Sequence, residues 1–253
     1  MDPILRIKNL SKTYDNGVQA LDDVTFDVPS GEFVAVIGLS GSGKSTLLRC
    51  INRLIDPTGG TIEFDGNDVT AANDSEMRHV RRRIGMVFQH FNLVHRSPVI
   101  TNVLAGRLGY VSPIWSLLNR FPKQDTDDAI AQLVRVGLED KAYDRADSLS
   151  GGQQQRVGIA RALMQNPRVI LADEPVASLD PVLAHSIMRH LEDINKQDGV
   201  TVLCSLHFLD LVHAYADRVI ALNDGKLMFD GLPTEIDDEK FKDIYGQEAE
   251  RVG

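Results

Sequence analysis

The stretch Gly38-Leu39-Ser40-Gly41-Ser42-Gly43-Lys44-Ser45-Thr46 decides the fold of this 253-residue chain. It fits the pattern G-x-x-x-x-G-K-[ST], in which glycines let the backbone curl until several N–H groups point at one phosphate. The apolar run Phe33–Ile37 precedes it and predicts a buried strand, and residues 44–54 predict a helix. A strand, a phosphate-binding loop and a helix in this order predict an α/β fold.

All nine residues of this phosphate loop are predicted to bind ATP, and two of them have further roles. The helix that begins at Lys44 presents its positive end to the phosphates, and the Lys44 ammonium can reach the β- and γ-phosphates. The Ser45 hydroxyl is predicted to ligate Mg²⁺. The alternative, a glycine turn without a ligand, is disfavoured by the flanking strand and helix.

The composition is that of a folded protein with a substantial core. Hydrophobic residues make up 43% of the chain, which suits one large domain or a domain with a subdomain. The apolar runs are far shorter than the ~20 residues of a membrane helix, and position 2 is an aspartate where a signal peptide would be basic. Cys50 and Cys204 form no disulfide framework, which favours a reducing cytosol and inert, buried thiols.

Charge argues against a nucleic-acid partner. The net charge is −9, whereas nucleic-acid-binding domains are usually basic. One local exception, the basic cluster at residues 78–83, is interpreted as a solvated helix face.

The order of predicted elements indicates an α/β core that is interrupted by helices. Strands are expected at residues 4–10, 19–28 and 60–64 near the N-terminus, which predicts an antiparallel β portion there. After a strand at 84–88 the pattern turns mostly helical, so we expect one domain over 1–253 with a helical subdomain at about 90–164. Strands at 169–173 and 200–205 enclose a helix at 181–197, and Asn223-Asp224-Gly225 predicts a hairpin before a short acidic helix.

The strand at residues 169–173 ends in two acids, Asp173 and Glu174. Strands often end in a solvated acid, so alone this pattern would be weak. Together with the upstream phosphate loop it resembles a Walker B motif. Asp173 is then predicted to hold Mg²⁺, and Glu174 to act as the general base for the attacking water.

A third motif, Leu149-Ser150-Gly151-Gly152-Gln153, precedes a helical run at residues 154–163. Two glycines at a helix N-terminus, with the Ser150 hydroxyl as a donor, make a second anion site, although such a stretch alone would be an ordinary capped helix start. Because the chain has one phosphate-loop lysine, a second cradle indicates a composite site. LSGGQ is the defining motif of ABC ATPases, and the chain resembles that family over nearly its whole length.

This resemblance implies a P-loop NTPase core with an antiparallel β subdomain and a helical subdomain. It also implies roles for residues that would be unremarkable singly. Tyr14 matches the residue that stacks on adenine, and Gln89 matches the Q-loop glutamine that senses Mg²⁺ and water. His207 matches the switch histidine at the γ-phosphate, and Asp180 belongs to the D-loop Ser178-Leu179-Asp180, which communicates across the dimer. The implied catalytic groups are Glu174, His207, Lys44 and Gln89.

The resemblance further implies a head-to-tail homodimer that sandwiches two ATP molecules. Ser150, Gly151, Gly152 and Gln153 of one copy would contact the ATP on the phosphate loop of the other. The implied partners are integral membrane permease subunits, with a periplasmic or surface substrate-binding protein acting through them. The expected location is peripheral, on the cytoplasmic face of the membrane.

Two stretches narrow the resemblance to the ATPase subunits of phosphonate importers. They are residues 174–181, where Val176 departs from the usual threonine, and residues 91–109, with a helical insert expected at 112–124 around Trp115. Import of phosphate, phosphite or polar amino acids stays open as an alternative. Outside transport, a soluble ABC ATPase of iron–sulfur assembly is the alternative; the uninterrupted single cassette argues against DNA-repair and translation-factor members.

Overall fold

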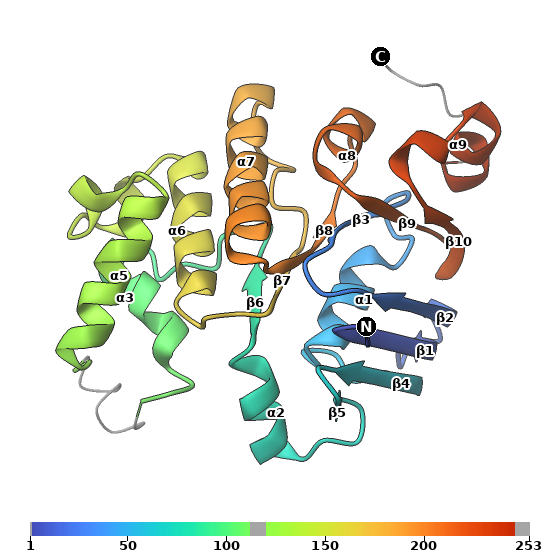
Figure 1. Cartoon of the computed structure of the whole chain (residues 1–253), viewed down its shortest axis with the longest axis horizontal. Coiled ribbons are helices and arrows are strands. Elements are labelled where there is room, and N and C mark those ends of the chain that lie inside the picture. Colours follow the sequence, from blue (N-terminus) through green and yellow to red (C-terminus); the bar gives the residue numbers. More distant parts are fainter. Residues whose placement is uncertain (1, 112–119, 246–253) are drawn as a thin grey trace.

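The chain is built on two β-sheets, as the computed structural model of residues 2–111 and 120–245 shows (Figure 1). The smaller sheet is antiparallel and has the strand order β2-β1-β4-β5. Its strands are β1 (Leu5–Thr13), β2 (Gln19–Val28), β4 (Gly59–Phe64) and β5 (Asn67–Asp68). This sheet is the antiparallel β portion predicted near the N-terminus.

The larger sheet has six strands in the order β10-β9-β3-β8-β7-β6, and all but β10 run parallel. Its strands are β3 (Phe33–Ile37), β6 (Ile84–Val87), β7 (Val169–Ala172), β8 (Thr201–Ser205), β9 (Arg218–Asn223) and β10 (Lys226–Gly231). β9 and β10 form the hairpin predicted at Asn223-Asp224-Gly225. The predicted α/β fold is confirmed.

Each face of the larger sheet is covered by its own hydrophobic core, because side chains alternate along a strand. Phe33, Ala35 and Ile37 of β3 belong to one cluster, whereas Val34 and Val36 belong to the other. The first cluster includes residues of α7 (Pro181–Asp198) and α8 (Leu209–Tyr215). The second includes α1 (Lys44–Ile51), α2 (Asp74–Arg81) and the smaller sheet. The β3 strand is therefore apolar throughout because both of its faces are buried.

A group of helices lies between β6 and β7 in the sequence and to one side of the sheets in space (Figure 1). Its members are α3 (Val99–Leu104), the 3₁₀ turn η1 (Ala105–Arg107), α5 (Lys123–Arg135) and α6 (Gly151–Leu163). Further 3₁₀ turns, η2 (Glu139–Lys141) and η3 (Ala146–Ser148), lead into α6, and η4 (Pro233–Glu235) precedes the last helix, α9 (Asp238–Tyr245). None of the helices in residues 2–111 and 120–245 is long and apolar enough to cross a bilayer.

Several predicted boundaries differ from the structure for local reasons. α1 ends at Ile51 rather than Leu54, because Asn52 leaves helical geometry and Arg53 has a positive φ of 54°. β1 continues beyond residue 10 to Thr13, where it still pairs with β2. α8 was not predicted, since seven residues are too few to show a clear helical period. Of the insert expected at 112–124, residues 112–119 lie outside the described part of the chain.

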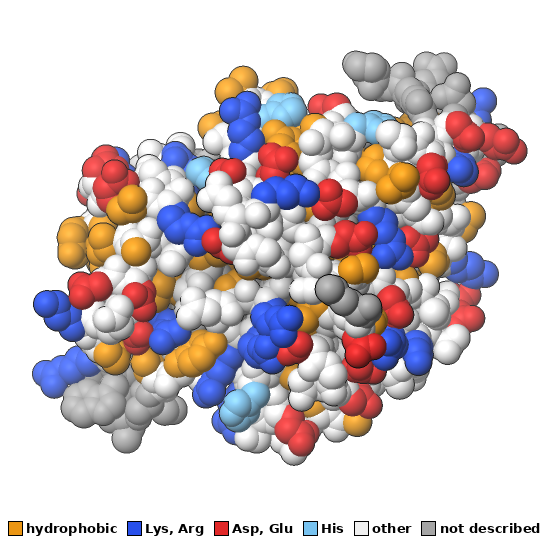
Figure 2. Space-filling model, in the orientation of Figure 1, with side chains coloured by type: hydrophobic (Ala, Val, Ile, Leu, Met, Phe, Trp, Pro, Cys, Tyr) orange, Lys and Arg blue, Asp and Glu red, His pale blue; other side chains and the backbone are white. Residues whose placement is uncertain are grey.

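The basic cluster at residues 78–83 lies on α2 and just after it. Arg81 donates to the carbonyls of Asn52 and Arg53, Arg82 donates to Gly109 O, and Arg83 pairs with Asp65. In Figure 2, acidic and basic side chains are interspersed over the face shown. Arg78, His79 and Arg81 are exposed, as a solvated helix face requires, whereas Arg82 and Arg83 are partly buried in tertiary contacts.

Both cysteines are free and buried, as the sequence predicted. Burial raises the pKa of the Cys50 thiol to about 12, and burial likewise raises the pKa of Cys204. Neither thiol is therefore poised for chemistry in the folded protein.

Two glycines at the α6 interfaces allow a matched test of packing. A Cβ at Gly106 would lie 2.2 Å from Arg161 O, whereas a Cβ at Gly158, inside α6, would meet only Phe91 O at 4.0 Å. Gly106→Ala should therefore lower the free energy of unfolding by about 1–3 kcal/mol through overpacking. Gly158→Ala should leave it unchanged or raise it by roughly 0.5–1 kcal/mol through helix propensity. Chemical denaturation of both variants checks this; equal losses would contradict it.

Candidate nucleotide-binding and hydrolysis site

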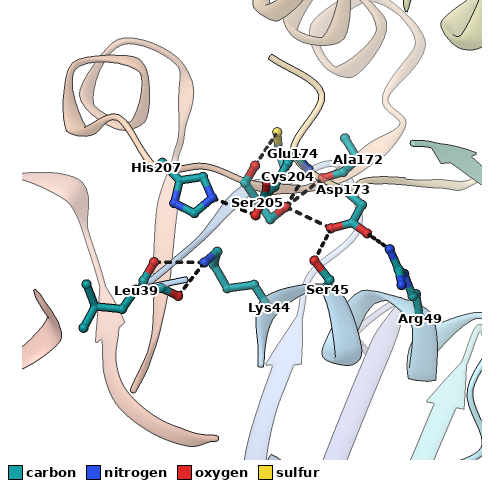
Figure 3. Close-up of polar contacts among 11 residues, drawn as sticks. Leu39, Lys44, Ser45, Arg49, Ala172, Asp173, Glu174, Cys204, Ser205 and His207 are labelled. Atoms are coloured by element: carbon teal, nitrogen blue, oxygen red, sulfur yellow. Dashed lines mark hydrogen bonds and ion pairs between the residues drawn. The ribbon is translucent and has the colours of Figure 1, made fainter. Parts of the chain in front are cut away.

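The carboxyl ends of β3, β7 and β8 meet at one edge of the larger sheet and hold the site (Figure 3). In the parallel register Val36 pairs with Ser205 and Ala172 pairs with Cys204, so the three strands end at nearly the same level. Ligand sites of open α/β sheets lie at this edge. The phosphate loop, the two acids after β7 and the histidine after β8 are far apart in the sequence and are thereby brought together.

The phosphate loop runs from β3 into α1, and two of its glycines are required by close backbone approach. Gly38 has φ 141°, and a Cβ there would lie 2.1 Å from Leu222 O. Gly43 has φ 104°, and a Cβ would lie 2.3 Å from Ala20 O. The Ser42 hydroxyl inside the loop is buried and has no hydrogen-bond partner among the residues that the structure describes. A buried polar group without a partner in a curled loop suits the binding of an anion.

The Lys44 ammonium lies at the centre of this loop and is 3% exposed. It donates to Gly38 O and Leu39 O, both at 2.9 Å (Figure 3). Burial lowers the pKa of Lys44, and the carboxylates of Glu174 and Asp173 oppose that shift. The cation therefore sits where a phosphate would be drawn into the loop.

The Asp173 carboxylate is buried directly after β7 and has polar contacts on both oxygens. Oδ1 accepts from the Ser45 hydroxyl at 2.6 Å, and Oδ2 pairs with the Arg49 guanidinium at 3.0 Å. A hydroxyl and a carboxylate side by side at the foot of the phosphate loop are hard oxygen donors of the kind that Mg²⁺ prefers. The residues present therefore fit the predicted Mg²⁺ site.

Glu174 and His207 form a second pair beside Asp173. The Glu174 Oε1 atom lies 2.7 Å from His207 Nε2, and both side chains are partly exposed toward the loop (Figure 3). Glu174 has a positive φ of 48°, which is uncommon for a residue other than glycine. A partly exposed carboxylate next to a histidine and across from a buried lysine is suited to orienting a water against a phosphate.

The remaining residues at this end are placed around the loop. The Tyr14 hydroxyl lies 3.2 Å from Thr46 Oγ1, and the residue is 36% exposed beside the loop, with Lys12 Nζ 5.3 Å from the centroid of its ring. Gln89 is half-buried two residues after β6. No contact joins the Gln89 side chain to Ser45 or Asp173, so the described structure does not itself place it among the metal ligands.

The LSGGQ residues do not reach the phosphate loop of the same chain. Ser150 caps α6 by accepting from Gln153 N at 3.3 Å, while Gln153 Oε1 accepts from Ser150 N at 2.9 Å. α6 and α1 lie on opposite sides of α7 in Figure 1. Gly152 packs against Leu183 at the start of α7, where Asp180 caps the helix by accepting from Val182 N and Leu183 N.

Sequence reasoning missed three residues that the structure adds to this region. Arg49 pairs with Asp173, and Ser205 accepts from Glu174 N at 2.7 Å. Arg161 donates to Phe91 O and Asn92 O, which anchors the segment after Gln89. Ser205 carried a usable signal, since it is a polar residue at the end of an apolar strand; Arg49 and Arg161 carried none, because each is a basic residue on an ordinary helix.

A family model described as ABC transporter matches residues 21–177 of the chain. The chain is 54% identical over 252 residues to the "Phosphonates import ATP-binding protein PhnC" of Bdellovibrio bacteriovorus, covering 99% of this chain and 97% of that protein. It is 53% identical over 253 residues to the protein of the same name from Shouchella clausii, covering 99% and 95%.

Solved structures agree with these relatives. An ATP-binding cassette determined as a dimer in a post-hydrolysis state with ADP and Pi has a TM-score of 0.80 at 36% identity, covering 90% of this chain and 98% of that one. The structure of cbiO1 from Clostridium perfringens, part of the ABC transporter complex cbiONQ, has a TM-score of 0.82 at 30% identity, covering 95% and 93%. The chain therefore belongs to the ABC transporter family, as one of its ATP-binding cassettes.

Proposed function

We propose that this protein is the ATP-hydrolysing subunit of an ABC importer for phosphonates. The observation that carries the ATPase activity is the convergence of Lys44, Ser45, Asp173, Glu174 and His207 at one sheet edge. Relatives that are 54% and 53% identical over 99% of this chain are named as phosphonate import proteins. These names support phosphonate as the substrate and favour transport over iron–sulfur assembly. We further propose that residues 1–253 are one nucleotide-binding domain with a helical subdomain at about 90–164.

In the proposed reaction, the phosphate loop binds the phosphates of ATP through its N–H groups and the Lys44 ammonium. Glu174 accepts a proton from the attacking water as general base, and His207, 2.7 Å away, orients the Glu174 carboxylate and faces the γ-phosphate. Ser45 and Asp173, with Gln89 as a further proposed ligand, would hold Mg²⁺, which supplies positive charge to the phosphate oxygens. Tyr14 is the proposed platform for adenine.

The proposed catalytic unit is a homodimer. Within one chain, α6, which begins at the signature residues Ser150, Gly151, Gly152 and Gln153, and α1, which follows the phosphate loop, lie on opposite sides of α7 in the view of Figure 1. A second copy would therefore be needed to bring the signature residues onto ATP. The dimeric cassette bound to ADP and Pi supports this arrangement. Asp180, which caps α7 beside Gly152, is the proposed contact for communication between the two copies.

The proposed partners are integral membrane permease subunits, which would hold the cassette at the cytoplasmic face of the membrane. The segment after Gln89 is the proposed docking surface. Arg161 holds this segment by donating to Phe91 O and Asn92 O. Asn102 holds it as well, because its Oδ1 accepts from Val94 N and its Nδ2 donates to Val94 O. A Cβ at Gly151 would lie 3.7 Å from Phe91 Cζ, so this segment lies close to the signature loop. A substrate-binding protein would act through the permease.

The base assignment predicts a separation of binding from hydrolysis. Glu174→Gln keeps the shape of the side chain but removes its basicity, so hydrolysis should fall about 10²–10⁴-fold while ATP binding persists. Lys44→Ala should instead weaken nucleotide binding. Steady-state phosphate release and equilibrium ATP binding measure the two effects. Glu139→Gln, at an exposed glutamate of η2, is the matched control; wild-type turnover by Glu174→Gln would refute the assignment.

The composite site predicts nucleotide-dependent dimerisation. Glu174→Gln protein should be dimeric with ATP and Mg²⁺ and monomeric with ADP, because only ATP would fill the site and bridge both copies. Ser150→Arg should prevent the dimer and spare ATP binding by the monomer. Ala131→Arg, on an exposed face of α5, is the matched control. Light scattering with each nucleotide tests this; an ATP-bound protein that stays monomeric at high concentration would count against the composite site.

The proposed substrate predicts a growth phenotype. A strain that lacks this gene and has no second phosphonate importer should fail to grow on a phosphonate as sole phosphorus source and grow normally on phosphate. Wild-type protein should restore growth, and the Glu174→Gln variant should not. Undiminished phosphonate uptake by the deletion strain would exclude this substrate and leave the ATPase assignment in place.

A further inference from the structure

Ser205 is a buried hydroxyl that lies between the two acids of the site although no motif includes it. Ser205 is the last residue of β8 and is fully buried. Its Oγ accepts from the backbone N–H of Glu174 at 2.7 Å and lies 3.4 Å from Asp173 Oδ1 and 3.5 Å from Ala172 O (Figure 3). One side chain thus contacts three successive residues at the end of β7.

The Glu174 backbone needs such a contact for two reasons. Its φ of 48° is a conformation that residues other than glycine hold only where the surroundings impose it. Its N–H points into the protein, and among the described residues Ser205 Oγ is the acceptor that it finds. A buried N–H without an acceptor is costly, so the hydroxyl and the turn stabilise each other.

This turn also directs the Glu174 side chain toward His207. With the backbone held in this conformation, Glu174 Oε1 lies 2.7 Å from His207 Nε2. Ser205 is two residues before His207, so a single segment fixes the backbone of Glu174 through Ser205 and its carboxylate through His207. Without the hydroxyl, the peptide at Glu174 could rotate and take the carboxylate away from its histidine.

We propose that Ser205 is a positioning residue for ATP hydrolysis, which holds the peptide of Glu174 so that the carboxylate faces the γ-phosphate. The inference rests on the proposed role of Glu174 as general base. It goes beyond that role, because it assigns the geometry of the base to a neighbouring strand. Because Ser205 is fully buried and has no surface open to a bound nucleotide, its loss should lower turnover and leave nucleotide affinity intact.

The test compares two buried hydroxyls of the same strand in the full-length protein. Thr201 Oγ1 accepts from Gly31 N at 2.8 Å and is also fully buried, but it lies at the opposite end of β8. Ser205→Ala should lower kcat about 5- to 30-fold, the factor in rate expected when a buried N–H loses its acceptor, with unchanged affinity for a fluorescent ATP analogue. Thr201→Val should leave kcat unchanged even if it lowers Tm equally. Ser205→Thr keeps a hydroxyl acceptor at this position, so it should retain most of the wild-type kcat.

Two further measurements distinguish an effect of Ser205 through Glu174 from an effect through Asp173. In a Glu174→Gln background, Ser205→Ala should cause little additional loss, because both changes act through one group. The Mg²⁺ concentration for half-maximal activity should not change; a rise with normal kcat at saturation would show an effect through Asp173 and overturn the proposal. Wild-type kcat in Ser205→Ala, or an equal loss in Thr201→Val, would also overturn it. Wild-type turnover by Glu174→Gln would instead refute the underlying base assignment.

Discussion

The common level at which β3, β7 and β8 end is the constraint on which the rest of this structure depends. Parallel pairing fixes that level, because Val36 faces Ser205 and Ala172 faces Cys204 across neighbouring strands. A slip of one residue in either pairing would move every side chain of a strand from one core to the other and spoil the packing of both. The hydrophobic cores on the two faces of the sheet therefore hold the register, and the register holds the loop, the two acids and the histidine within contact.

Buried charge is the cost of that arrangement. Lys44 and Asp173 are each almost fully buried, and both are stabilised by polar contacts rather than left alone. Lys44 donates to two loop carbonyls, and Asp173 accepts from Ser45 and pairs with Arg49. A protein built only for stability would replace such groups with apolar ones, so their presence at a sheet edge is an indication of function.

The sequence predicted those parts of the site whose chemistry is local. The phosphate loop is one continuous stretch with its strand and helix on either side, and β2 and β3 have the bounds that alternation and hydrophobicity predicted. The partners of Asp173 and Glu174 could not be predicted in the same way. Arg49 lies on α1 and Ser205 on β8, so their contacts depend on helix orientation and sheet register, which no single window of sequence contains. The assigned roles of the site residues, Tyr14, Gln89 and Asp180 among them, remain predictions.

The hydrogen bonds of Lys44 to its own loop have a consequence for the energetics of ligand capture. By tying Gly38 O and Leu39 O to one cation, they fix the curl of the loop while the protein folds. The conformational entropy of those residues is then lost during folding and is not lost again when an anion arrives. The loop is thus preorganised, and more of the interaction free energy between its N–H groups and a phosphate appears as affinity.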